Sequence, residues 1–159
     1  MADLLVKLYQ LPDPASAYER IDETGYRITR PLAPERSVVV DWVSGRFGTR
    51  WADEVKMAFS GHPISCFVAT DDTSRIVGFA CYDATFKAFF GPSGVDERHR
   101  GKGIGTALLL RSLYAMENSG YAYAVIGYSG ADEYYRSTVG AIAIEGSDPG
   151  PYREWLKTD

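Results

Sequence analysis

Cysteine and histidine are scarce in this sequence. Two of each occur in 159 residues, and their spacings match no zinc-site pattern. Long apolar runs are absent as well, since none approaches the roughly eighteen residues that span a bilayer. The first ten residues lack the basic region and the cleavage site of a signal peptide. The sequence therefore predicts no metal site and no membrane partner, and we expect a cytoplasmic protein.

Basic residues are also fewer than acidic ones, with 17 Lys and Arg against 21 Asp and Glu. The formal net charge is −4, so no broad basic face is available to neutralise a nucleic-acid backbone, and we expect no nucleic-acid partner. Hydrophobic residues make up 45% and charged residues 24%, which is typical of a globular chain that can bury one sizeable core. We therefore expect a single domain over residues 1–159, with an N-terminal arm at 1–25 and a C-terminal tail at 146–159.

Against this background the stretch RGKGIG at residues 100–105 stands out. It lies between an apolar extended segment that ends at Val95 and a helix that is expected to open at Ile104. Glycines leave backbone N–H groups bare there; at a helix start those groups have no intrahelical partner, and the helix dipole favours an anion. With four basic residues within 98–102, the stretch predicts a phosphate-binding loop. A glycine-rich turn with a solvated basic rim is the alternative interpretation.

The spacing of the glycines decides which phosphate loop this is. A nucleoside triphosphate loop needs Gly-x-x-x-x-Gly-Lys-Ser/Thr, and a dinucleotide loop needs Gly-x-Gly-x-x-Gly. Here Gly101, Gly103 and Gly105 recur at every second position, and Leu108 stands where the dinucleotide pattern needs its last glycine. Neither of those two loops fits.

The pattern of apolar residues predicts one alternating α/β unit that begins at Tyr26. Strands are expected at 26–29, 65–70, 76–83, 89–95, 122–128 and 141–145. Helices are expected at 35–46, 49–59, 104–118 and 131–138, with a further short helix at 15–23 after an extended arm at 4–11. The strand at 89–95 contains Gly91, Pro92 and Gly94. Because proline donates no ladder hydrogen bond, this strand must bulge or splay from a neighbour.

The loop and the element order together resemble a known family. Arg100-x-x-Gly103-x-Gly105 is similar to the coenzyme A pyrophosphate loop of the GNAT superfamily of acyl-CoA-dependent N-acetyltransferases. Residues 26–145 follow the element order of that fold, and Tyr135 matches the tyrosine of its aromatic-Tyr-x-x-x-Gly segment, with one extra residue before Gly140. The resemblance implies a single-domain α/β (α+β) fold, whose mixed and mostly antiparallel sheet is flanked by helices and splayed between its fourth and fifth strands.

The resemblance implies acetyl-CoA as the acyl donor and a small-molecule primary amine as the acceptor, joined by direct attack in a ternary complex. The coenzyme-binding residues that match the family's loop are Val95, Arg100, Gly101, Lys102, Gly103, Ile104, Gly105 and Thr106. A non-catalytic acyl-CoA-binding or regulatory module is the alternative. Such a module would explain only the loop, whereas an enzyme would also explain the splayed strand and Tyr135.

Acyl transfer to an amine needs a hydrogen-bond donor for the thioester oxygen, a proton acceptor for the amine and a proton donor for the thiolate. A splayed strand supplies the first as the Val95 backbone N–H, and the resemblance implies that Tyr135 supplies the last. The glutamate that some family members carry on the strand before the loop is absent from residues 87–90. Asp83, acting through a water, is the candidate base, and Glu54 is an alternative. Each of these side chains also has the plainer interpretation of an ordinary packed or solvated residue.

Aromatic residues recur along the two helices expected at 35–59. Core packing against the sheet is one interpretation, and a wall around the acceptor is the other. Arg46 and Arg50 lie among these aromatics and are candidates to meet a carboxylate on the acceptor.

Two further expectations concern the cysteines and the chain ends. If Asp71 pairs with Ile76 across a turn, then Cys66 lies opposite Cys81, and both should remain buried thiols. The segment 152–157 should form a short last strand or a helical turn. This tail or the N-terminal arm is also the expected contact of a possible homodimer.

Overall fold

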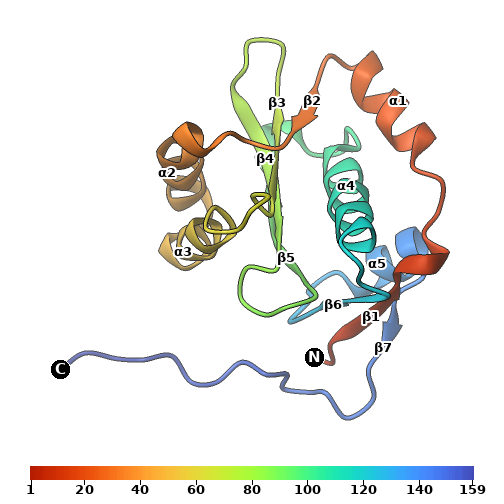
Figure 1. Cartoon of the computed structure of the whole chain (residues 1–159), viewed down its shortest axis with the longest axis vertical. Helices are drawn as coiled ribbons and strands as arrows, with labels where there is room; N and C mark the ends of the chain where they lie inside the picture. The colour runs from red at the N-terminus through yellow and green to blue at the C-terminus, as the bar shows by residue number, and fades with distance from the viewer.

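A seven-stranded mixed sheet forms the centre of the protein, with the strand order β2-β3-β4-β5-β6-β1-β7. The computed structural model describes all 159 residues (Figure 1). The strands are β1 (Leu4–Lys7), β2 (Arg27–Thr29), β3 (Cys66–Thr70), β4 (Ile76–Tyr82), β5 (Phe89–Val95), β6 (Tyr123–Ile126) and β7 (Ile142–Ala143). The helices are α1 (Ala15–Glu23), α2 (Arg36–Phe47), α3 (Thr49–Ala58), α4 (Ile104–Asn118) and α5 (Asp132–Val139). The expected single-domain α/β fold is confirmed.

Helices cover both faces of this sheet. α2 and α3 pack on one face of its β3–β5 half, and α4 packs on the other face with α1 beside it (Figure 1). Four consecutive buried residues at 107–110, followed by Leu113 and Met116, give α4 a broad apolar face that the sheet covers. The helix ends before Gly120, whose φ of +100° suits a glycine stop. α4 therefore supplies a large part of the core, from Ile104 in its first turn to Met116 in its last.

The β3–β4 hairpin has the expected register at its far end, where Cys66 lies opposite Cys81. Both cysteines are buried free thiols, and burial raises the pKa of the Cys81 thiol well above its ordinary value. Near the turn the register differs from the expectation, because Ile76 pairs with Thr70 rather than with Asp71. The Asp71 carboxylate accepts hydrogen bonds from the backbone N–H groups of Thr73 and Arg75, which tightens the turn and leaves an irregularity in the ladder.

The N-terminal segment 1–25, expected as an arm, contributes a strand to the sheet. β1 lies between β6 and β7 and is antiparallel to both, with Leu4 opposite Ile126 and Ala143. Its alternate residues Leu4 and Val6 are fully buried against the α4 side of the sheet. The sheet thus gains a strand that the sequence pattern did not place, because strand pairing over more than a hundred residues leaves no local signal.

No helix or strand follows β7, so the expected last strand or helical turn over 152–157 is wrong. Pro149 and Pro151 donate no ladder hydrogen bond, and Gly146 and Gly150 have φ values of +75° and +82°. The tail leaves β7 and runs as extended chain toward the side of the molecule that carries α2 and α3 (Figure 1).

Candidate active site

β5 and β6 form a wedge. They run parallel and pair only through Phe89 with Val125 and Phe90 with Ile126. Beyond these pairs β5 remains paired with β4. It carries a β-bulge there: one extra residue of β5 lies opposite Cys81, and Gly91 in the bulge has a φ of +119°. The bulge turns β5 away from β6, so the expected splay between the fourth and fifth strands of the fold is confirmed.

The backbone N–H of Val95 points into this wedge. Asp96 N–H donates to the Val77 oxygen at 2.9 Å, and Val95 lies directly opposite Gly78. In an antiparallel ladder bonded and non-bonded pairs alternate, so the N–H and C=O of Val95 face away from β4 and toward the wedge. The Val95 oxygen accepts a hydrogen bond from Arg100 Nε at 3.2 Å, which agrees with that direction. Val95 therefore presents a backbone donor on the splayed edge.

The N-terminus of α4 lies directly after this strand and is open. Gly103 is the N-cap, with φ +84° and no side chain to cap the helix, and the first helical hydrogen bond runs from Ala107 N–H to the Gly103 oxygen. The N–H groups before Ala107 therefore have no intrahelical partner. A Cβ at Gly105 would meet only Val95 Cγ2, at 3.8 Å, and one at Gly101 would meet nothing within 4 Å. The loop thus exposes bare backbone donors at the positive end of the α4 dipole.

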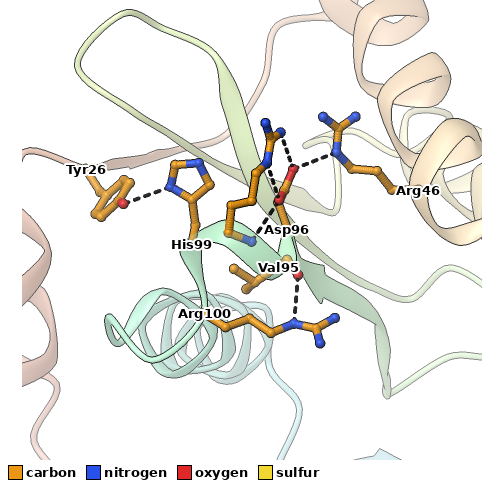
Figure 2. A network of polar contacts seen from close by, with 7 residues as sticks. Tyr26, Arg46, Val95, Asp96, His99 and Arg100 are labelled. Atoms are coloured by element: carbon orange, nitrogen blue, oxygen red, sulfur yellow. Dashed lines mark hydrogen bonds and ion pairs between the residues drawn. The ribbon is translucent and has the colours of Figure 1, made fainter.

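The basic residues before α4 also hold the loop in shape (Figure 2). Asp96 is buried and accepts hydrogen bonds from Arg98 Nη2 at 3.0 Å and from Arg46 Nε at 2.9 Å. These two guanidiniums, Arg98 first, lower the pKa of the Asp96 carboxyl far below its ordinary value. Arg46, expected to meet an acceptor carboxylate, therefore meets Asp96, which joins α2 to the start of the loop.

Sequence reasoning missed three supports of this loop. The Tyr26 hydroxyl lies 2.8 Å from His99 Nδ1 (Figure 2) and accepts a hydrogen bond from Lys102 Nζ at 3.1 Å. Arg20 of α1 donates to the Gly101 oxygen at 3.0 Å, and its Cδ would lie 3.1 Å from a Cβ at Gly103. Arg20 adds a cation to the rim of the loop, and no local motif could have indicated it because α1 reaches the loop only through its packing on α4.

Two adjacent tyrosines of α5 reach the site from the far side of the wedge. Tyr135 is half-buried, with its ring 6.4 Å from that of Phe90 on β5. Burial raises the pKa of its phenol, and the nearby Ser93 side chain partly offsets this, so the phenol carries its proton at neutral pH. The Tyr134 hydroxyl lies 2.9 Å from Thr106 Oγ1 in the first turn of α4. The two side chains therefore contact different elements: Tyr135 lies beside β5, and Tyr134 lies beside the first turn of α4.

Asp83 lies at the closed end of the wedge, in the loop that joins β4 to β5. One carboxylate oxygen accepts a hydrogen bond from Ala88 N–H at 2.7 Å, and the other accepts one from the Tyr121 hydroxyl at 2.9 Å. The residue itself has a φ of +51°, which a short hydrogen-bonding side chain tolerates. These contacts give Asp83 a structural task, the bracing of the β4–β5 loop.

Glu54 has a different environment. It is half-buried on α3, and its carboxylate accepts a hydrogen bond from the Thr85 hydroxyl in the β4–β5 loop. Burial raises the pKa of the Glu54 carboxyl, and the Thr85 hydrogen bond partly offsets this. Such a carboxylate takes up a proton more readily than a solvated one, which is the property of a general base.

The aromatic residues of α2 and α3 are chiefly core residues. The rings of Phe47 and Trp51 stack at 5.2 Å, and both lie beside Phe79 of β4. A Cβ at Gly94 would lie 2.6 Å from the Phe47 ring, so the glycine on β5 makes room for this packing. Arg50 places its guanidinium 4.5 Å from the Trp155 ring centroid in the tail. The packing interpretation therefore holds for the cluster, and Arg50 turns toward the tail.

The structure brings together no group of three or more His, Cys, Asp or Glu side chains that could hold a metal ion. None of the helices combines the length and the apolar character that a bilayer crossing requires.

Known structures share this fold. The chain matches a GCN5-related glucosamine N-acetyltransferase region of a fungal multi-domain β-N-acetylglucosaminidase with a TM-score of 0.73, at 16% identity over 90% of this chain and 19% of that one. A GCN5-related N-acetyltransferase from Sphaerobacter thermophilus gives 0.67, at 18% identity over 90% and 48%. The Escherichia coli GNAT family N-acetyltransferase YhbS in complex with CoA gives 0.54, at 20% identity over 71% and 67%. The chain spans less than half the length of the first two, and at these identities the likeness shows the fold alone.

The sequence itself gives the family. No curated protein matches the chain. A family model described as the acetyltransferase (GNAT) family matches residues 26–141, from the start of β2 through the wedge, the loop and α5. With that match covering most of its 159 residues, the chain belongs to the acetyltransferase (GNAT) family.

Proposed function

We propose that this protein is an N-acetyltransferase that moves an acetyl group from acetyl-CoA to a primary amine of a small molecule, by direct attack in a ternary complex. The observation that carries the proposal is the wedge: Val95 N–H points between β5 and β6, and the open N-terminus of α4 follows directly. A backbone donor on a splayed edge suits a carbonyl oxygen that gains negative charge. The bare N–H groups after it suit a pyrophosphate.

The residues of the loop fit the acyl donor. No atom lies within 4 Å of a Cβ placed at Gly101, and only Val95 Cγ2 lies within 4 Å of one at Gly105, which leaves room for a pyrophosphate to approach the N–H groups from 101 to 106. Arg100 and Lys102 supply positive charge beside them, and Arg20 adds a further cation from α1. The pantetheine arm would add to the exposed edge of β5 by backbone hydrogen bonds, as extended ligands do at sheet edges.

Tyr135 is the proposed general acid. Its phenol is protonated at neutral pH and lies beside Ser93 on the wedge strand, so it can donate a proton as the C–S bond breaks. Asp83 is left out of this mechanism because both of its oxygens are engaged in the β4–β5 loop. Of the three catalytic groups expected from the sequence, Val95 and Tyr135 remain in this mechanism.

The test of the function is the release of free thiol from acetyl-CoA with and without a panel of primary amines. Glucosamine belongs in the panel because one structural neighbour is a glucosamine N-acetyltransferase region. Release that saturates with an amine, with intersecting initial-rate lines when both substrates are varied, supports direct attack. Acetyl-CoA binding without amine-dependent release would instead favour the non-catalytic acyl-CoA-binding module, which the missing acid at residues 87–90 makes worth testing.

A tyrosine-to-phenylalanine pair tests the acid. Tyr135→Phe should lower kcat by roughly a hundredfold or more, because general acid catalysis is typically worth that much. Tyr134→Phe removes the neighbouring hydroxyl, which bonds to Thr106, and should act mainly on acetyl-CoA binding. Unchanged turnover in Tyr135→Phe would remove this residue from the mechanism, and a loss of kcat confined to Tyr134→Phe would reverse the assignment.

A further inference from the structure

A cavity of about 670 Å³ lies between α3, the β4–β5 loop and the C-terminal tail. Arg50, Thr85 and Phe86 form one side of it, and residues 151–156 of the tail form the other. Its volume is within the usual range for small-molecule sites. The tail therefore has a role in the structure as one wall of a partly open pocket.

Aromatic contacts link this cavity to the wedge. The ring of Phe86 lies 5.1 Å from that of Phe89, which begins β5 and pairs with Val125 of β6. The Tyr152 ring lies 5.8 Å from Phe86, and a Cβ at Gly127, just after β6, would meet it at 3.2 Å. The cavity thus borders both wedge strands at the point where they diverge, on the face opposite α4.

The residues that line the cavity carry charges of both signs. Arg50 is engaged with the Trp155 ring, and the exposed Arg153 and Glu154 at the rim have opposite signs. Two carboxylates lie near the cavity without lining it. One is the half-buried Glu54, and the other is Asp3, which is only 6% exposed and whose Oδ1 has no hydrogen-bond partner. Burial raises the pKa of the Tyr152 phenol, and the negative charges of both carboxylates raise it further, which places that ring near the two of them.

We infer that this cavity is the acceptor subsite, that it takes a primary amine carried on an aromatic or apolar body, and that Glu54 receives the proton of the attacking amine. The inference rests on the proposed N-acetyltransferase function. Phe86, Tyr152 and Trp155 supply flat apolar surface for the body of the acceptor, while Glu54, joined to the cavity wall through Thr85, supplies the carboxylate for the amine. Aromatic faces also attract ammonium groups.

The proton balance is complete with these groups. An amine that arrives as an ammonium first releases one proton to water. The neutral nitrogen then bonds to the acetyl carbon as the C–S bond breaks, and the second proton that it loses goes to Glu54. The thiolate takes its proton from Tyr135, and both side chains return to their starting states by exchange with water. Glu54 thus takes the place of the acid that residues 87–90 lack.

The test uses the full chain and two amines, 2-phenylethylamine and glucosamine, with acetyl-CoA held at saturation. Glu54→Gln keeps the shape of the side chain and its bond to Thr85, and should lower kcat for 2-phenylethylamine by about a hundredfold. Asp53→Asn is the matched control, because it removes a carboxylate from the adjacent position of α3, where Asp53 is exposed and pairs with Lys56. Trp155→Ala should raise the KM for 2-phenylethylamine and leave the KM for acetyl-CoA unchanged.

The outcomes separate this inference from the function on which it rests. Wild-type protein that acetylates an amine, with Glu54→Gln and Asp53→Asn turning over alike, would overturn the role of Glu54 and keep the acetyltransferase. A clear preference for glucosamine over 2-phenylethylamine would overturn the acceptor class. If the wild type releases no thiol in an amine-dependent way, the proposed acetyltransferase function itself is contradicted. Melting temperatures of all variants within a few degrees of the wild type show that each difference is catalytic.

Discussion

The helix start after the glycine loop allows a test in which stability and binding move in opposite directions. Gly105 has an ordinary helical φ, and a Cβ there would meet only Val95 Cγ2 at 3.8 Å. Replacement by leucine should therefore fit without strain. Leucine is a better helix former than glycine by up to about 0.8 kcal/mol. The unliganded Gly105→Leu variant should melt at the wild-type temperature or up to about 3 °C above it.

Binding should respond in the other direction. Long side chains in a helix point back toward its N-terminus, so the leucine introduced by Gly105→Leu would cover the N–H groups that we assign to the pyrophosphate. Acetyl-CoA at a hundred times its Kd stabilises a protein by about 2.7 kcal/mol, which is roughly 5–10 °C at this chain length. Loss of one or two charge-assisted hydrogen bonds weakens binding about a hundredfold. At the same concentration the remaining gain is about 0.4 kcal/mol, or roughly 1 °C.

The assay is thermal melting of wild type and variant with and without acetyl-CoA, with ATP as a second ligand. Gly45→Leu is the matched control: Gly45 lies inside α2 with nothing within 4 Å of its missing Cβ, and this change should leave the acetyl-CoA shift intact. A full acetyl-CoA shift in Gly105→Leu would refute the assignment of the pyrophosphate to the start of α4.

Other consequences follow from the same contacts. Asp96→Asn should lower the free energy of unfolding at pH 7 by about 1–2 kcal/mol, since it weakens hydrogen bonds to two partly exposed arginines. The folded-state pKa of Asp96 is lowered, so the stabilisation by its carboxylate is present above the ordinary aspartate pKa and is lost as pH falls below it. The free energies of unfolding of wild type and Asp96→Asn, measured by urea melts, should therefore converge below about pH 4. A constant difference down to about pH 2 would contradict this interpretation. Cys66 and Cys81 should both react with a thiol reagent in denaturant without reductant. In the native protein they should react only slowly, because both are buried and the pKa of Cys81 is raised. Fewer than two reactive thiols in denaturant would indicate a disulfide. Arg20→Ala should weaken acetyl-CoA binding about two- to fivefold, as expected for an exposed charge, with titration calorimetry as the measurement; unchanged affinity would exclude Arg20 from the phosphate site.

Much of the site could be predicted because its signals are local. The start of α4 follows from glycine spacing and its end from Gly120, and the splay of β5 follows from Gly91 and Pro92, so a few adjacent residues decide each feature. The opposition of Cys66 and Cys81 could also be predicted, since hairpin register needs only the position of the turn. The one-residue irregularity at Thr70 escaped because it depends on where the Asp71 carboxylate finds its partners.

The features that could not be predicted depend on residues far apart in the chain. β1 is four residues long and pairs with β6 and β7. No pattern within Leu4 to Lys7 predicts this pairing. Arg46 was expected at an acceptor, and it instead neutralises Asp96, fifty positions away. Asp83 was expected as a base because of its place at a strand end, and its carboxylate also accepts a hydrogen bond from Tyr121, 38 positions away. In each case a distant partner decided the outcome, and the sequence alone did not reveal it.

The most direct test of the account is the hydrogen exchange of the Val95 amide, followed by NMR with and without acetyl-CoA. The Asp96 amide is the internal control, because it already donates to the Val77 oxygen. We predict that saturating acetyl-CoA slows exchange at Val95 by at least about tenfold and changes Asp96 little. Saturated binding with Val95 exchanging at its original rate would contradict the claim that the wedge between β5 and β6 holds the acyl donor.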